Sequence, residues 1–338
     1  MKPKSHNTGK LRCTLQRNPL IVCLRAVGFV LFITCVPSLA QSSVELRKSL
    51  LVLNSEPVEL SIAIRKADVD ILYNREGEVS ITAVARAEND SKLDDAYFAG
   101  TLGVEQLRNH VSLRQIANEG YSEEKIKVRF RIDVPYRTEV SSVVGEGKQV
   151  IRGILGPAEA RAGRGDINAS YVSKTVHAET GRGNLDLQVI GEHVEAKTLD
   201  GNISGERLPQ GISAETHDGD ITLSVVGACT ATVKRGTGRI DVGGARGPLT
   251  ASTDLGTLHV QAVPHEDWNL NSNSGTIRID LPPAAKFELE ASTSSGEIQI
   301  ERDDLSKAAT GLHQTIQQAN GGGKRIKVQT ETGKIVIR

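Results

Sequence analysis

Two aspartates flank a glycine in the segment AETHDGDITL, where Asp218, Gly219 and Asp220 are consecutive. Carboxylates at this short spacing could hold a cation, since Ca²⁺ prefers oxygen ligands, or act on a sugar, since glycosidases use paired carboxylates. The same residues also suit a tight turn, because glycine accepts a positive φ and aspartate bonds to nearby backbone amides. The neighbouring sequence decides between the chemical and the structural interpretation.

The glycine of this segment recurs along the second half of the chain. Nine copies align on it, at Gly165, Gly183, Gly201, Gly219, Gly238, Gly256, Gly275, Gly296 and Gly333. The first seven are 18 or 19 residues apart, the next step is 21 residues, and the last step of 37 residues is about two periods. The chain therefore repeats one short unit, which is the signature of a repeat architecture.

Apolar residues alternate with polar ones on both sides of each repeated glycine. The residue two places after it is always Ile or Leu, and the residues five and seven places before it are always apolar. Threonine stands three places before it in six copies. Alternation on both sides of a glycine predicts a strand, a turn and a second strand, each with one buried face.

A unit of two short strands cannot bury its apolar face alone, but stacked copies can. We expect each strand to pair in parallel with its copy in the next coil, about 4.8 Å away. The predicted fold class is all-β: a parallel β-solenoid with coils of about 18 residues and two short strands per coil. Asp218 and Asp220 then flank a corner, so we interpret them as turn residues, and we expect a positive φ at each corner glycine.

The first forty residues have the pattern of a secretory signal peptide. They carry six basic residues and no acidic one, then an apolar stretch at 26–36 and small residues at Ser38 and Ala40. We predict residues 1–40 as a signal peptide cleaved after Ala40, and an exported product that is periplasmic, cell-surface or secreted. An uncleaved membrane anchor is the alternative, although Arg25 interrupts the apolar run.

The remaining chain divides into two parts. Residues 41–140 alternate less strictly but contain strand-like segments, so we expect an N-terminal β region that caps the solenoid. Residues 141–338 are assigned to the solenoid repeats, with a degenerate first coil around Gly147. The polar segment 303–324, which contains NGGG, explains the long last step, and we expect a projecting loop insertion there.

Charge and cysteine content exclude several function classes. The chain has 41 basic and 41 acidic residues, and removal of the basic leader leaves a mildly acidic protein. We therefore expect no nucleic acid partner, which would need a concentrated basic face. Three of the four cysteines precede Ala40, so Cys229 has no partner for an intramolecular disulfide, and we expect a packed thiol.

Other candidate residues have structural explanations. His177, His193, His217 and His259 occupy different phases of the repeat, so they predict isolated surface histidines rather than a metal site. The aspartates near the glycines are out of register with calcium-binding glycine-rich repeats. The GRGD segment at 163–166 coincides with a repeat corner, and Trp268 occupies an inward position. We therefore predict no catalytic, metal or cofactor-binding residue and no small-molecule cofactor; the binding residues and the oligomeric state stay open.

The segments IDVPYRTEV, GDINA, GNLDL, GNISG and GDITL, followed by IDLPPAAKFELEASTSSGEIQI and KVQTETGKIVIR, resemble the bacterial putative-adhesin family of unknown function. The resemblance covers roughly residues 44–338. It implies an exported β-solenoid and carries over no catalytic residue.

We therefore expect a non-catalytic envelope or cell-surface protein that binds a surface glycan or an envelope protein as an adhesin or scaffold. Two alternatives stay open. One is a carbohydrate-active enzyme, a polysaccharide lyase or hydrolase on a β-helix, which would need converging acidic side chains. The other is an envelope scaffold or sensor that binds other proteins.

Overall fold

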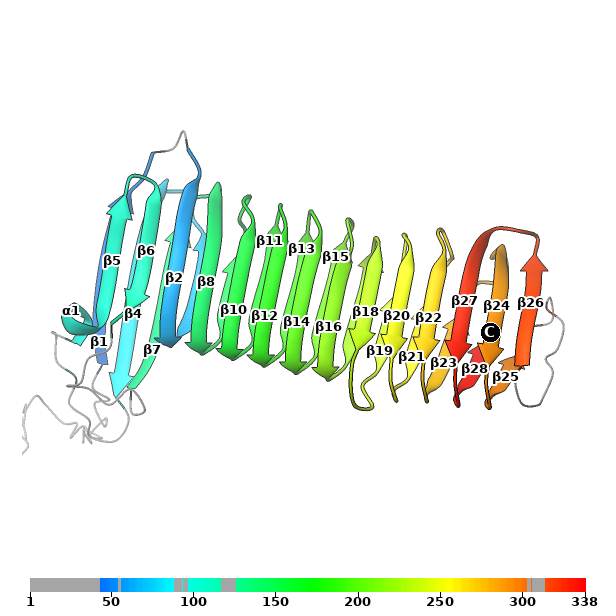
Figure 1. Ribbon diagram of the computed structural model, residues 1–338. Coiled ribbons are helices and arrows are strands. Elements are labelled where there is room, and N and C mark those ends of the chain that lie inside the picture. Colours follow the sequence, from blue (N-terminus) through cyan, green and yellow to red (C-terminus); the bar gives the residue numbers. More distant parts are fainter. Residues whose placement is uncertain are drawn as a thin grey trace, which may run out of the picture. The chain divides into compact units, whose positions relative to one another are not determined.

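The computed structural model describes residues 43–53, 56–87, 93, 97–116, 126–302, 305 and 314–338. The predicted signal peptide, residues 1–40, lies outside this part, and Gln41–Arg338 forms one compact unit. The described residues form two sheets of fourteen strands each and one short helix, α1 (Tyr97–Thr101) (Figure 1). Within these residues, no helix is long and apolar enough to cross a membrane.

The two sheets contain the strands in the following spatial order. The first, sheet A, contains β1 (Ser43–Leu51), β4 (Glu78–Ala87), β7 (Ile126–Val134), β3 (Asp68–Tyr73), β9 (Gln149–Arg152), β11 (Ile167–Val172), β13 (Leu185–Ile190), β15 (Ile203–Leu208), β17 (Ile221–Val226), β19 (Ile240–Gly243), β21 (Leu258–Gln261), β23 (Thr276–Asp280), β28 (Lys334–Ile337) and β25 (Glu297–Ile300). The second, sheet B, contains β5 (Leu102–Leu107), β6 (His110–Gln115), β2 (Val58–Lys66), β8 (Thr138–Glu146), β10 (Ala158–Arg164), β12 (Val176–Arg182), β14 (Val194–Asp200), β16 (Ile212–Asp218), β18 (Cys229–Val233), β20 (Leu249–Thr253), β22 (Trp268–Ser272), β27 (Lys324–Thr330), β24 (Phe287–Thr293) and β26 (Gln314–Asn320).

Equivalent positions of successive repeats lie beside one another, as the period predicts. Ile203 is the Cα partner of Ile221 in sheet A, and Ala196 is the partner of Ala214 in sheet B, both in parallel pairs. Each coil contributes one strand to each sheet, for example β16 and then β17. The predicted fold class, a parallel β-solenoid with two short strands per coil and an N-terminal β cap, is confirmed.

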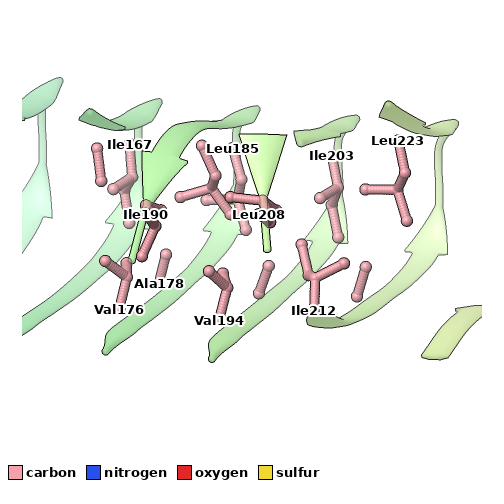
Figure 2. Packing of buried hydrophobic residues seen from close by; sticks show 14 of the residues in the cluster. Ile167, Val176, Ala178, Leu185, Ile190, Val194, Ile203, Leu208, Ile212 and Leu223 are labelled. Carbon is pink, nitrogen blue, oxygen red and sulfur yellow. The ribbon is translucent and has the colours of Figure 1, made fainter. Parts of the chain in front are cut away.

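The core lies between the two sheets. Ile167, Leu185 and Ile203 of sheet A form one row, and Val176 and Val194 of sheet B lie in the row that faces it (Figure 2). All of these side chains are at most 2% exposed. Each such aliphatic side chain stabilises the fold by roughly 1.5–3 kcal/mol, so the alternating pattern, copied along the coils, accounts for the stacking.

The last coil of the chain does not stack last. Strands β27 and β28 lie between β22/β23 and β24/β25, so that Ile335 pairs with Ile277 on one side and with Ile298 on the other (Figure 1). The expectation that coils stack in sequence order is wrong for this end. The reason is physical: the units around Gly275, Gly296 and Gly333 carry the same apolar pattern, so each can pair with either of the others.

Regular stacking extends further toward the N-terminus than the sequence indicates. Strands β2 and β3 form a coil that pairs in parallel with β8 and β9, where the segment around Gly147 forms the predicted extra coil. Strands β6 and β7 lie outside that coil. Strands β1, β4 and β5 are antiparallel to their neighbours, and they form the irregular cap.

The segment 303–324 differs from the expected loop. Residues 314–320 form β26, which pairs antiparallel with β24 at the edge of sheet B. The residues 303–304 and 306–313 lie outside the described part of the chain. The strand β26 was not predicted because its composition is polar. An edge strand pairs on one side only, so it can form without the apolar alternation that identifies the other strands.

The corner glycines are explained by two different constraints. Gly219 has a φ of 150°, as predicted, and a Cβ there would lie 2.0 Å from the carbonyl oxygen of Gly201. Gly275 has no such φ, which corrects the prediction for the later coils, yet a Cβ there would lie 1.9 Å from the carbonyl oxygen of Gly256. Close approach of stacked backbones therefore requires glycine at both types of corner.

Candidate functional site

The aspartates beside the corner glycines take part in a ladder of hydrogen bonds. The backbone N–H of Asp220 donates to the side chain of Asn202 at 2.8 Å, and the Asp220 carboxylate accepts from the backbone N–H of Arg239 at 2.7 Å. Asp166, in the GRGD segment, accepts in the same way from Asn184 at 2.8 Å. Asp166 and Asp220 thus have a structural role, as expected, but their carboxylates bond to the next coil and not to the nearby turn backbone that the sequence indicates.

The prediction of isolated surface histidines is wrong for three of the four, because His177 and His193 line one groove on sheet B and His259 lies beside two carboxylates. His177 lies 3.0 Å from Glu195, and His259 lies 3.2 Å from Asp241 and 2.7 Å from Asp280. His193 contacts Ser213 at 3.2 Å. No three His, Cys, Asp or Glu side chains of the described ranges are placed to hold a metal ion together.

Trp268 and Cys229 are core residues, as expected. Trp268 is 1% exposed, and its Nε1 donor has no protein partner. Cys229 is 3% exposed, and burial raises the pKa of its thiol to about 12. Neither side chain is available to a ligand at the surface.

A shallow groove of about 620 Å³ crosses the outer face of sheet B, from β6 to β14. It carries neighbouring carboxylates, since Glu59 and Glu139 are Cα partners on β2 and β8. Glu59 contacts His110 at 3.2 Å, and the pKa of Glu195 is lowered, first by its hydrogen bond from Lys197 and then by His177. Several acidic groups of this groove are thus already paired with histidine or lysine, in exposed contacts that stabilise by at most about 1 kcal/mol each.

Exposed tyrosines gather at a second place, beside the C-terminal ends of the interior strands β3, β9 and β11 of sheet A. Tyr73, Tyr136 and Tyr171 are 43%, 46% and 52% exposed. Tyr73 and Tyr136 make an edge-to-face contact, with ring centroids 5.6 Å apart and an interplanar angle of 68°. These three residues, together with Arg152 and Gly153, are called the tyrosine patch below.

The tyrosine patch contains a pocket between two of its rings. Leu72 pairs with Arg152, and Arg152 pairs with Ser170, so Tyr73, Gly153 and Tyr171 follow at one level on β3, β9 and β11. Two strand spacings place the Cα atoms of Tyr73 and Tyr171 about 10 Å apart. The Tyr73 side chain lies against Gly153, where a Cβ would be 3.0 Å from the Tyr73 Cβ. The pocket of about 340 Å³ is lined by Leu72, Tyr73, Arg152, Gly153 and Tyr171.

The backbone at this level presents the side chains outward. Six successive coils have a residue with positive φ here: Gly153, Tyr171, Val189, Arg207, Val225 and Gly244. In Tyr171 the φ is 55°, a conformation that costs an L residue about 1–2 kcal/mol relative to its usual one. The following residue in each of the four non-glycine cases, for example Val172, is buried, so the kink exposes one side chain and buries the next.

Arg152 supplies the charge of the patch. Its guanidinium carbon lies 5.4 Å from the centroid of the Tyr171 ring, which is a cation–π contact. Arg152 forms no ion pair with any residue of the described chain. The tyrosine patch therefore combines aromatic faces, an unpaired cation and an open pocket, which are groups that a ligand could use.

The tyrosine patch was not predicted from the sequence. Tyr73, Tyr136 and Tyr171 are far apart in sequence, and they meet only because β3 stacks beside β9 and the turn before β8 lies next to them. One feature of the sequence did point to it. Tyr171 directly precedes Val172, an apolar residue that recurs in the following coils, so the tyrosine side chain is expected on the outside. The stacking of β3, which lies in the less regular region, was not predicted.

Comparison with known proteins identifies the fold. The model of a family described as Toastrack DUF4097 matches residues 58–338. No curated protein matches the chain. The chain is also similar to a solved putative cell adhesion protein from Clostridium sporogenes, with 10% identity over 87% of this chain and 98% of that chain and a TM-score of 0.24.

Two further solved structures are similar to this chain. One is a putative adhesin from Bacteroides fragilis, with 8% identity over 87% of this chain and 95% of that chain and a TM-score of 0.34. The other is a putative adhesin from Parabacteroides distasonis, with 12% identity over 87% of this chain and 97% of that chain and a TM-score of 0.29.

Proposed function

The chain belongs to the Toastrack DUF4097 family, in agreement with the resemblance noted from its repeats, and from its fold we propose that it is an exported, adhesin-like binding scaffold without catalytic activity. The observation that carries this proposal is the tyrosine patch. Exposed aromatic rings beside an arginine are typical of binding surfaces, where aromatic residues and arginine are enriched.

The solenoid supports a binding role in a second way. Its strands are held by continuous ladders, so Tyr73, Arg152 and Tyr171, on β3, β9 and β11, have a fixed spacing. Sites on such elements are pre-organised, and binding then costs little ordering entropy. Export of the product rests on the signal peptide predicted for residues 1–40.

The proposal is tested with the mature chain, residues 41–338. The purified protein is applied to a glycan array and to whole bacterial cells, and the same glycans are incubated with it to detect cleavage. Saturable binding without product is expected. Cleavage would establish the enzyme alternative, and the double variant E59Q/E139Q would show whether the carboxylates of the sheet B groove are responsible. Binding to envelope proteins alone would favour the scaffold or sensor alternative.

Export is tested separately by expression of the full chain. Fractionation should place the protein outside the cytoplasm, and mass spectrometry should find an N-terminus at Gln41. A product that keeps residues 1–40 and stays in the membrane fraction would favour the uncleaved anchor.

A further inference from the structure

We propose that the pocket of the tyrosine patch binds a uronic acid unit of an acidic polysaccharide. This inference rests on the proposed function, because it names the ligand class of the same surface. The pyranose ring would lie in this pocket against the exposed rings of Tyr73 and Tyr171, with its carboxylate on Arg152.

The aromatic groups fit a sugar ring. The face of a tyrosine ring is electron-rich, so it attracts the C–H groups that line one face of a pyranose. Tyr73 and Tyr171 are both about half exposed, and both line the pocket. A pocket of about 340 Å³ has room for one ring.

The charge of the pocket selects an acid. The fork of the guanidinium group matches a carboxylate, and a charge-assisted pair is stronger than a hydrogen bond to a neutral hydroxyl. Arg152 lies over the Tyr171 ring and forms no ion pair with any described residue. A bound carboxylate would therefore gain a cation without displacing a carboxylate of the described residues.

The backbone around the pocket disfavours an extended peptide. Strand β9 lies between β3 and β11, so its N–H and C=O groups are already used in the sheet. A peptide that adds a strand requires an unpaired edge, which this site does not offer. A proline-rich peptide, which uses aromatic grooves without such an edge, is the alternative that the experiment must distinguish.

Tyr171 allows a test in which loss of binding is not caused by unfolding. Its φ of 55° suits glycine better than tyrosine, so Y171G removes the ring and relieves the backbone at the same time. The matched control is V225G, which makes the same backbone change three coils away at a residue of similar exposure. R278Q, at an exposed arginine of β23 outside the patch, is the control for R152Q.

Binding is measured by calorimetry with short oligogalacturonates, alginate oligomers and hyaluronan oligosaccharides, and with methyl-esterified oligogalacturonates as the uncharged match. At least one acidic series should bind the mature chain, and Y171G and Y73A should each weaken it about tenfold or more. R152Q should abolish the preference for the acid over its methyl ester. V225G and R278Q should bind like the parent chain.

Three results would overturn the assignment. They are no binding of any acidic series, equal binding by Y171G and the parent chain, or binding of a proline-rich peptide at the same residues. Binding of a glycan that is insensitive to Y171G and R152Q would refute this site but leave the proposed function in place. Failure of the mature chain to bind any glycan, cell or envelope protein would instead refute the proposed function.

Discussion

Single residues in this protein are constrained more by stacking than by chemistry. Asp220 illustrates this, because its carboxylate accepts a backbone N–H from the next coil and is not converging with other acids on a substrate. The sequence made this role predictable, since the same position is Asp or Asn in four consecutive repeats. The positive φ at Tyr171, Val189, Arg207 and Val225 could not be predicted, because none of these residue types favours that conformation.

Val225 provides a stability test of this strain. It is a β-branched residue with a φ of 54° and a 41% exposed side chain. V225N should raise the free energy of unfolding by about 1 kcal/mol, because asparagine tolerates the left-handed region. Urea denaturation measures the change, and V225A is the control, since alanine keeps the Cβ clash. Equal stability of V225N and the parent chain would show that the strain is relieved elsewhere.

Cys229 should be an unreactive thiol in the folded protein. Burial raises its pKa from the ordinary 9.0 to about 12, so the thiolate is scarce at about pH 8. Iodoacetamide labelling of the mature chain should therefore be slow and should accelerate in denaturant. The stabilising effect of burying the neutral thiol is present below the unfolded pKa and is lost as the pH rises from there toward about 12. Rapid labelling without denaturant would mean that β18 opens locally.

At the scale of elements, the sequence predicted the repeat strands and several N-terminal strands, but it predicted neither β26 nor all of the strand neighbours. Ile203 and Ile221 are neighbours because 18 residues separate them and no other segment intervenes. The coils of Gly275, Gly296 and Gly333 share the same apolar pattern, so the period alone cannot specify that β27 lies between β22 and β24. The edge strand β26 was not predicted, because its sequence QTIQQAN is mostly polar and lacks the alternation of the repeats.

Engineered disulfides can test the order of these strands. Lys327 is the Cα partner of Asn269 on one side and of Glu290 on the other. Adjacent strands place such Cα atoms about 4.8 Å apart, within the range of a disulfide, whereas Asn269 and Glu290 are two strands apart.

The double variant N269C/K327C should therefore oxidise to a cross-linked chain, and N269C/E290C should not. Proteolysis and mass spectrometry detect the cross-link, and Cys229 is buried and should not compete. Cross-linking of the second pair alone would mean that the coils stack in sequence order in solution.

At the scale of the whole described unit, stability should be close to a sum over coils and their interfaces, because each coil contacts mainly its neighbours. Residues 184–201 span one period, and their removal would join Gly183 to Asn202 with the register intact. This deletion should give a folded protein with a cooperative thermal transition, measured by circular dichroism.

Removal of residues 184–192 alone should abolish that transition. Half a period would send the following strands to the wrong sheet, and Gln210 would fall at the corner position of Gly201, where a Cβ would lie 2.0 Å from the carbonyl oxygen of Gly183. If both deletion variants fold equally well, stacking does not depend on whole 18-residue periods, and the prediction is wrong.

The position of β27 and β28 also has a consequence for biosynthesis. Residues 324–337 leave the ribosome after residues 287–300, yet they separate that earlier segment from β22 and β23. While the nascent polypeptide is still growing, residues 287–300 either have no strand partner on the side that β27 and β28 later occupy or pair there with a temporary one. This end of the molecule therefore reaches its native arrangement only after translation has passed Ile337, and translocation in the N-to-C direction would delay it in the same way.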